Sequence, residues 1–225
     1  MVITVCALIA AFNEEAHVAD VVKGTAPYAS PVVVVDDGST DNTAARARDA
    51  GAIVIRSEQN HGKGWAIRTG LEYALKQDRS HVLFLDADLQ HDPAEIPRLI
   101  ARAEQGHGDF VIGEREFRKD AMPAARFYAN ITGSAIISWF IGVDVADSQS
   151  GFRLIRADLL RRLRLTATGY EIETEMLLKL IRAGAAVERV TVRRLQYERA
   201  HSKIRPFRDT ARTCLLAFWY WYLPS

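Results

Sequence analysis

Polar and acidic side chains follow three apolar segments of the chain, directly where each segment ends. Asn13 and Glu15 follow the first segment, residues 36–41 (DDGSTD) follow another, and residues 86–92 (DADLQHD) follow a third. Any one of these runs would also make a good turn or helix cap. The three together instead predict a shared binding edge.

Asp86 and Asp88 have the spacing of a cation site. Alternate residues of an extended segment point the same way, so both carboxylates would face one side, with Gln90 following if the extension continued. Two converging carboxylates repel each other unless a cation lies between them. Such oxygen ligands suit Mg²⁺ or Mn²⁺ that is shared with substrate phosphates.

Residues 60–64 (NHGKG) form a glycine-flanked basic turn that leads into a helical pattern. Such a turn lets the backbone approach a ligand closely, and Lys63 together with the helix N-terminus favours an anion. The spacing is not that of a Walker P-loop, and G-x-G-x-x-G occurs nowhere in the chain. The pattern therefore disfavours a nicotinamide dehydrogenase.

Short β-branched runs alternate with helical patterns over the first 115 residues. The expected strands are Val2–Ala10, Val32–Val35, Ile53–Ile55, Val82–Leu85 and Asp109–Ile112. The expected helices are Glu14–Gly24, capped by Asn13, and then Asp41–Ala50, Lys63–Lys76 and Pro93–Gln105. This order predicts one α/β domain with a mainly parallel central sheet flanked by helices, in which ligands bind beyond the carboxyl ends of the strands.

The composition is that of a globular protein, but its charge is unevenly placed. The 225 residues are 48% hydrophobic and 25% charged, which excludes a disordered or fibrous chain. Residues 1–152 carry 14 Lys and Arg against 21 Asp and Glu, whereas residues 153–225 carry 15 against 7. The net charge of +1 predicts no nucleic-acid partner, but the acidic part could hold a cation and the basic part could meet an anion.

Two cysteines and the apolar segments bear on the cellular compartment. Cys6 and Cys214 show neither metal-ligand spacing nor a disulfide framework, so a reducing compartment is expected. The first residues lack a basic leader, and we do not expect a signal peptide. The longest apolar stretch, Cys214–Leu223, has ten residues, about half of the ~20 that span a bilayer, so no membrane-spanning helix is expected.

Eight segments of the chain together resemble a known enzyme family. They are ALIAAFNEE, VVVVDDGSTDNT, NHGKGWAIRTG, LDADLQHDP, DFVIGER, DSQSGFRLIR, GYEIETEMLLKL and YERAHSKIRPFRDT. In this order they resemble glycosyltransferase family 2, the inverting sugar-nucleotide enzymes of GT-A fold, over residues 3–210. The pieces DADLQHDP and HSKI look most like the branch that glycosylates polyprenyl (dolichyl-type) phosphates.

The resemblance implies both an architecture and a reaction. It implies a Rossmann-like GT-A domain over residues 1–210, with donor and metal binding in residues 1–115, acceptor binding in residues 116–210 and an apolar aromatic tail at 211–225. The implied reaction moves mannose or glucose from GDP-mannose or UDP-glucose to a polyprenyl phosphate, with Mg²⁺ or Mn²⁺ as the cofactor.

The resemblance also implies roles for individual residues. Ala11, Asn13 and Glu15 would border the nucleotide, and Asp37 would contact the nucleobase or ribose. The full donor-binding set is Ala11, Asn13, Glu15, Asp37, Lys63, Asp86, Ala87 and Asp88, and the metal set is Asp86, Asp88 and Gln90. The catalytic set is Asp88, Arg115, Arg126, Glu173, Arg199 and Lys203.

Within the catalytic set, the arginines and Lys203 are expected to hold phosphate. By resemblance, Arg115 and Arg126 help to hold the acceptor phosphate and the donor, and Arg199, Ser202 and Lys203 lie on a segment that folds back over the site. Guanidinium forks and the lysine point charge suit phosphate oxygens well. A solvated basic face is the alternative for this late segment.

The acceptor decides whether the reaction needs a general base. A phosphate monoester, with a second pKa near ~6, is already anionic at neutral pH. A sugar hydroxyl must instead lose its proton during attack. By resemblance, Glu171, Glu173 and Glu175 lie where many hydroxyl-directed relatives place their base, and Glu173 or Asp147 would then be the base or would instead position the donor sugar. Glu171 and Glu175 are as readily explained as acids at a helix start. A hydroxyl acceptor and a non-catalytic sugar-nucleotide-binding subunit are the alternatives.

The C-terminal tail combines aromatic residues with a preceding basic segment. Trp219, Tyr220, Trp221 and Tyr222 are amphipathic aromatics of the kind that favour a bilayer interface. We expect peripheral contact with the cytoplasmic face of a membrane. The alternative is a tail packed on the domain, in a homodimer or against a membrane-protein partner.

Overall fold

The computed structural model describes residues 2–106, 108–115, 124–193 and 195. For residues 124–131 and 141 it describes the backbone alone. The expectations that fall on Arg199, Ser202, Lys203 and the tail 211–225 therefore lie outside the described residues.

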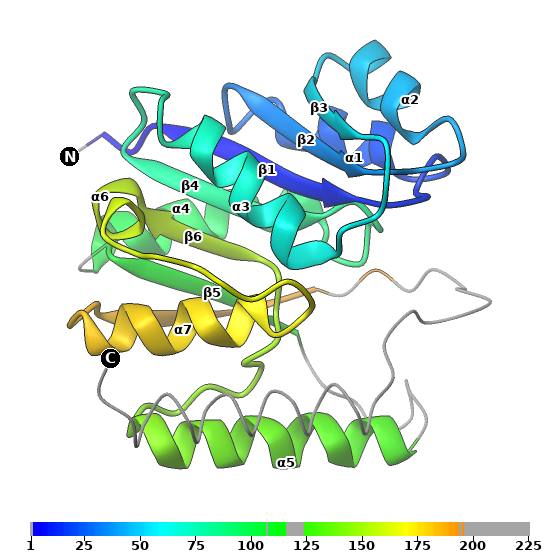
Figure 1. Cartoon of the computed structure of the whole chain (residues 1–225). Coiled ribbons are helices and arrows are strands. Elements are labelled where there is room, and N and C mark those ends of the chain that lie inside the picture. The colour runs from blue at the N-terminus through cyan, green and yellow to red at the C-terminus, as the bar shows by residue number, and fades with distance from the viewer. Residues whose placement is uncertain (1, 107, 116–123, 194, 196–225) are drawn as a thin grey trace.

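A seven-stranded sheet forms the centre of the molecule, in the order β3-β2-β1-β4-β6-β5-β7 (Figure 1). The strands are β1 (Val5–Ala11), β2 (Val32–Asp37), β3 (Ile53–Ser57), β4 (His81–Asp86), β5 (Phe110–Arg115), β6 (Arg153–Arg156) and β7 (Val187–Val192). Strand β6 runs antiparallel to both of its neighbours, and the other strand pairs are parallel. The expected mainly parallel α/β sheet in a single domain is confirmed.

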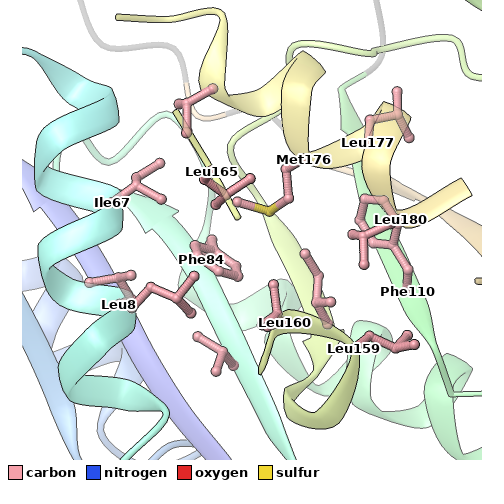
Figure 2. Packing of buried hydrophobic residues seen from close by; sticks show 14 of the residues in the cluster. Leu8, Ile67, Phe84, Phe110, Leu159, Leu160, Leu165, Met176, Leu177 and Leu180 are labelled. Carbon is pink, nitrogen blue, oxygen red and sulfur yellow. The ribbon is translucent and has the colours of Figure 1, made fainter. Parts of the chain in front are cut away.

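Helices cover both faces of the sheet because successive strand residues point to opposite sides. In β1, Cys6 and Leu8 pack in one apolar cluster with α3 (Lys63–Ala74), α6 (Ala157–Arg161) and α7 (Ile172–Arg182). Figure 2 shows part of this cluster, in which Ile67 of α3 and Met176 of α7 lie over Leu8 and Phe84. Ala7 and Ile9 pack in the other cluster with α1 (Val18–Thr25), α2 (Thr43–Asp49) and α4 (Ile96–Gln105).

Helix α5 (Ala124–Ile141) packs on the layer that contains α7. Figure 1 shows it at the lower edge of the molecule, beyond α7. Ile137 is buried in the cluster beneath α7, whereas Trp139 remains 75% exposed. Among the residues that the structure describes, no helix combines the length and the apolar character needed to cross a bilayer.

Two helix starts differ from expectation. Asn13 does not cap the first helix, which begins at Val18 after His17. Asn13 instead has a φ of 52°, and its side-chain oxygen accepts a hydrogen bond from Thr40 N, so residues 13–16 belong to a loop. The helix expected from Pro93 begins as a 3₁₀ turn (Pro93–Glu95) and becomes α4 at Ile96.

Gly70 of α3 allows this helix to lie directly on the sheet. A Cβ at Gly70 would collide with Leu8 Cδ1 and would lie 2.8 Å from Val35 Cγ2. Both of those side chains are buried in the cluster beneath α3, so they cannot move aside into solvent. The close contact between α3 and the sheet therefore requires a residue without a side chain here.

We predict that Gly70→Ala lowers the free energy of unfolding by about 1–3 kcal/mol, as overpacking of a filled core usually does. Urea unfolding followed by circular dichroism measures this change. Glu72→Ala, at an exposed position of the same helix, is the matched control and should unfold like the unmodified protein. Equal midpoints for Gly70→Ala and Glu72→Ala would contradict the proposed close packing.

Candidate functional site

The polar runs meet at the carboxyl edge of three neighbouring strands. Ala11 of β1 pairs with Asp36 of β2, and Ala10 of β1 pairs with Asp86 of β4. The ends of these strands therefore lie side by side, and the loops that leave them share one edge of the sheet. This is where open α/β sheets bind their ligands.

The loops after β1 and β2 are joined by hydrogen bonds between side chains and backbone. Asn13 Oδ1 accepts from Thr40 N at 2.8 Å, and Glu15 Oε2 accepts from Asn42 N at 3.0 Å. Ala11 is buried at the end of β1, beneath these loops. Ala11, Asn13 and Glu15 thus shape the rim together, and their contact with a nucleotide stays a prediction.

Asp37 anchors the glycine-flanked turn that precedes α3. Its Oδ1 accepts from His61 N at 2.8 Å and its Oδ2 accepts from Gly62 N at 2.7 Å. The side chain is buried, so the carboxylate lies beneath the turn rather than on the surface. This geometry gives Asp37 a role in holding the turn, and its expected contact with a nucleobase or ribose remains untested.

The glycines of this turn allow close approach to another part of the chain, and their approach to a ligand stays a prediction. A Cβ at Gly64 would collide with the carbonyl oxygen of Ala167, and one at Gly62 would lie 2.5 Å from the carbonyl oxygen of Thr168. Gly64 N donates a hydrogen bond to that same oxygen of Thr168 at 2.9 Å. The turn is therefore fixed between Asp37 on one side and the loop before α7 on the other.

Lys63 joins three elements at the bottom of the site. As the first residue of α3, it places Nζ 2.6 Å from Asp86 Oδ1 at the end of β4 and 2.5 Å from Glu173 Oε1 in the first turn of α7. Burial lowers the pKa of Lys63, but the charges of Asp86 and Glu173 outweigh this and hold the pKa above its ordinary value. Burial likewise raises the pKa of Asp86, and the Lys63 ammonium brings it below its ordinary value. Lys63 and Asp86 are therefore both charged at neutral pH.

The segment after β4 is a turn. Its side chains nevertheless alternate between buried and partly exposed, as they would in an extended strand. The strand ends at Asp86, and Leu89 has a φ of 56°, so the expected extension does not continue. Ala87 and Leu89 are nevertheless buried, while Asp86, Asp88 and Gln90 are partly exposed. Asp88 Oδ1 accepts from Gln90 N at 3.0 Å, which stabilises the turn. Asp86, Asp88 and Gln90 thus lie on its exposed side.

Arg115 and Asp147 form a bidentate ion pair near these carboxylates. Arg115 Nε lies 2.6 Å from Asp147 Oδ2, and Arg115 Nη2 lies 3.0 Å from Oδ1. Burial raises the pKa of Asp147, but Arg115 outweighs this effect and holds the pKa low. Burial lowers the pKa of Arg115, but the charge of Asp147 outweighs this effect and raises it. The charges of Asp86 and Asp88 raise the same pKa further. Arg115 therefore lies within electrostatic reach of both acids.

Arg153 and His91 are buried groups that the sequence did not single out. Arg153 donates to the carbonyl oxygens of Ser150 at 2.7 Å, Ser148 at 2.8 Å and Glu173 at 2.5 Å, and its burial lowers its pKa to about 10. Burial lowers the pKa of His91 to about 4, so this imidazole is neutral at neutral pH. An arginine inside the apolar run GFRLI was the one available signal for Arg153.

Comparison with protein families identifies the chain. Residues 6–164 match the family described as glycosyl transferase family 2. The chain belongs to glycosyl transferase family 2. The family expected from the sequence is therefore confirmed.

Relatives of this family 2 chain include several named transferases. It is 32% identical to glycosyltransferase AglJ of Haloferax volcanii over 213 residues, which are 91% of this chain and 68% of AglJ. It is 31% identical to the UDP-N-acetylglucosamine–dolichyl-phosphate N-acetylglucosaminyltransferase of Methanococcus voltae over 76% of this chain and 77% of the relative. It is 30% identical to the undecaprenyl-phosphate mannosyltransferase of Micrococcus luteus, over 78% of this chain and 76% of the relative. Relatives from the polyprenyl-phosphate branch are thus among the matches.

A solved structure matches nearly the whole fold. Glucosyl-3-phosphoglycerate synthase from Mycobacterium tuberculosis, in complex with Mn²⁺, UDP-glucose and phosphoglyceric acid, superposes with a TM-score of 0.77. The match covers 99% of this chain and 81% of the synthase at 25% sequence identity. The expected GT-A fold is confirmed.

The acids of the family 2 site fit a divalent cation that is shared with a substrate. The described residues contain no group of three His, Cys, Asp or Glu side chains that could hold a metal by themselves. Lys63 contacts Asp86 through Oδ1, while Oδ2 faces Gly151. Asp86, Asp88 and Gln90 would supply part of a coordination shell that donor oxygens and water complete, as is usual for Mg²⁺.

The structure leaves some expected residues untested. Arg126 lies in the described backbone of α5, but its side chain is outside the described part. Arg199 and Lys203 lie beyond it altogether. Of the expected residues that are described, Lys63, Asp86 and Glu173 meet directly, and Arg115 lies close to Asp86 and Asp88.

We predict that Gly151→Ala weakens binding of Mn²⁺ together with a nucleoside diphosphate by at least about tenfold, since small displacements at such sites have large effects. The added methyl would lie 2.8 Å from Asp86 Oδ2, so the carboxylate would have to turn away. Isothermal titration calorimetry with Mn²⁺ and UDP or GDP measures the change. Glu72→Ala, at an exposed position of α3, is the control. Unchanged affinity in Gly151→Ala would show that Asp86 does not need this position.

Proposed function

We propose that the chain is an inverting, metal-dependent transferase that moves mannose or glucose from a nucleotide sugar to a polyprenyl phosphate. Asp86, Asp88 and Gln90 hold the cation with the donor diphosphate at the carboxyl edge of β4. The loops around Asn13, Glu15 and Asp37 form the nucleotide side of the site.

This proposal rests on how the two candidate bases, Glu173 and Asp147, are buried and bound. The Glu173 carboxylate is buried against the Lys63 ammonium, and the Asp147 carboxylate is bound by the Arg115 guanidinium. The Glu173 side chain is only 5% exposed behind Lys63, and Arg115 holds the pKa of Asp147 below its ordinary value, so neither carboxyl is placed to take a proton from an acceptor hydroxyl. An acceptor that needs no base fits this arrangement, and a phosphate monoester with a second pKa near ~6 is such an acceptor.

The names of related proteins support the same acceptor class. Two relatives are named for undecaprenyl phosphate and dolichyl phosphate, and a further one is a polyprenol monophosphomannose synthase. The superposed synthase was solved with Mn²⁺ and UDP-glucose, which supports a divalent cation and a nucleotide-sugar donor. These names support sugar transfer to a lipid phosphate.

The proposed reaction is a single displacement. An oxygen of the acceptor phosphate forms a bond to the anomeric carbon, while the bond from that carbon to the donor diphosphate breaks with inversion. A bound cation would neutralise the charge that develops on the leaving diphosphate. Asp86 and Asp88 orient the donor, and Arg115 offers positive charge beside them. The catalytic contribution is alignment and electrostatic stabilisation.

The remaining expectations extend the proposal to the later part of the chain. Arg126, Arg199 and Lys203 would hold the acceptor phosphate, so that residues 116–210 form the acceptor part and residues 1–115 form the donor part. The tail 211–225 would give the peripheral membrane contact. A hydroxyl acceptor is the alternative within the same family.

Matched lipid acceptors test the proposed function directly. We expect the protein with Mn²⁺ or Mg²⁺ to transfer sugar from GDP-mannose or UDP-glucose to a short polyprenyl phosphate but not to the corresponding polyprenol. Thin-layer chromatography and mass spectrometry of the lipid product measure both reactions. Transfer to the polyprenol at an equal rate would favour the hydroxyl alternative, and no transfer to either lipid across a donor panel would refute the proposal.

We predict that Asp88→Asn lowers kcat/KM for the transfer by at least about 100-fold, because the amide removes one charge from the cation site. Asp92→Asn is the control, since Asp92 caps the next turn and asparagine caps equally well. EDTA should abolish the reaction, and added Mn²⁺ or Mg²⁺ should restore it. Metal-independent turnover by Asp88→Asn at the unmodified rate would disprove the metal assignment.

A further inference from the structure

Lys63 is the centre of a buried group of three charges that no other part of the proposed mechanism explains. Its Nζ touches Asp86 Oδ1 at 2.6 Å and Glu173 Oε1 at 2.5 Å. The side chains of Lys63 and Glu173 are only 13% and 5% exposed, whereas that of Asp86 is 26% exposed. Asp86 is therefore the member of the group that faces the site, and Glu173 lies behind Lys63.

The surroundings of Glu173 leave no space for an acceptor. Lys63, Asp86 and Glu173 line a cavity with room for about one water molecule. Its remaining walls are mostly apolar side chains, namely Leu8, Ile67, Phe84, Leu85 and Met176. A space of this size has no room for a sugar ring, and the Glu173 side chain is only 5% exposed, so Glu173 faces the interior of the protein.

The backbone of Glu173 is fixed as firmly as its side chain. Arg153 Nη1 donates to the Glu173 carbonyl oxygen at 2.5 Å, and the same guanidinium binds Ser148 and Ser150. The first turn of α7 is thereby joined to the loop that contains Asp147 and Gly151. This arrangement holds the Glu173 carboxylate in one place relative to Asp86.

Lys63 also resolves an electrostatic conflict. Without it, Asp86 and Glu173 would face each other as like charges beside apolar walls, where such charges interact strongly. Among the described residues, Arg115, His91 and Arg153 also interact electrostatically with Asp86, and Arg153 interacts with Glu173 as well. Arg115 is bound to Asp147, and Arg153 binds backbone carbonyls.

We propose that Glu173 is a positioning residue and not a base: it fixes Lys63, and Lys63 holds Asp86 in the orientation that binds the cation and the donor diphosphate. Lys63 and Glu173 thus form a counter-ion pair within the donor site. This inference rests on the proposed function, because it assigns a role within the same site.

A double-mutant cycle tests this assignment. The variants are Lys63→Met, which keeps most of the side-chain volume, Glu173→Gln, and the two changes combined. Three measurements are made on each variant: affinity for Mn²⁺ with UDP or GDP by calorimetry, kcat and donor KM in the lipid assay, and urea unfolding without ligand.

We expect the single changes to differ in severity and the double change to recover function. Lys63→Met should weaken Mn²⁺–nucleotide binding about 100-fold and raise donor KM, since it leaves two facing carboxylates. Glu173→Gln should change both quantities by less than about tenfold, because Lys63 still holds Asp86. The double variant should bind about tenfold more tightly than Lys63→Met, since the introduced amide can donate to Asp86 where the carboxylate repelled it.

The Lys179–Glu175 pair supplies a matched control on the same helix. Lys179 Nζ lies 2.7 Å from Glu175 Oε1, and the two side chains are 14% and 1% exposed, much as Lys63 and Glu173 are. Glu175 holds the backbone of residues 166–167 and does not line the cavity with Asp86. Residues 166–167 adjoin Thr168, which binds Gly64, so the cycle of Lys179→Met and Glu175→Gln should show coupling in unfolding but at most about twofold coupling in Mn²⁺–nucleotide affinity.

Two results would overturn the inference. If Glu173→Gln alone abolished kcat with donor affinity unchanged, and the double variant were no better than Lys63→Met, Glu173 would be the base. If Lys63→Met bound Mn²⁺–nucleotide more tightly, Lys63 would compete with the cation instead of positioning Asp86.

Failure of the proposed function would look different from failure of this inference. Were the unmodified protein to transfer no sugar to any lipid, the proposed function would fall. Coupling between Lys63 and Glu173 in unfolding and in Mn²⁺–nucleotide binding would still be measured in that case. The absence of coupling in both would refute the counter-ion pair by itself.

Discussion

Compensation of buried charge is the constraint on which this site depends. The carboxyl edge of the sheet holds Asp86 and Asp147 in surroundings that would favour their neutral forms. Each remains ionised because a cation from another element touches it, Lys63 from α3 in one case and Arg115 from β5 in the other. Without these cations the like charges at this edge would repel one another, and a carboxyl group that took up a proton in response would bind a metal less tightly. The positions of α3 and β5 are therefore as important to the site as the acids themselves.

Topology explains how these partners reach one another. Strand β6 enters between β4 and β5 and runs antiparallel to both, so the loop that leads into it crosses the carboxyl edge where β4 ends. That loop carries Asp147 to Arg115 and Gly151 to Asp86. Arg153, at the start of β6, then binds both this loop and the first turn of α7. One reversed strand thus brings the later part of the chain to the site formed by the earlier part.

The sequence predicted features that depend on local pattern and missed those that depend on distant contacts. Runs of apolar residues predicted the strands around Val34, Val54 and Leu83. The polar residues that follow these runs predicted the site at the carboxyl edge, including the acids of the DADLQ segment. Asn13 looked like a helix cap because its competing partner, Thr40, is 27 residues away. Strand β6 is only four residues long and has arginine at both ends, so no alternation marks it. The partners of Lys63 and Arg153 could not be predicted, because Glu173 comes from a helix whose packing only the whole fold determines.

The acidic and basic parts of the sequence are not separated in the folded protein. Ion pairs join the acidic and the basic parts of the chain: Lys63 meets Glu173, Arg156 lies 2.6 Å from Asp109, and Arg102 lies 2.6 Å from Glu188. Strands β6 and β7 of the later part also lie in the same sheet as β1–β5. The donor and acceptor parts proposed along the chain are therefore not separate bodies. If Glu173 positions Lys63, the part assigned to the acceptor also maintains the donor site, and a change at the start of α7 must affect both substrates. The common dependence on Lys63 would then couple donor binding to the arrangement of the acceptor side.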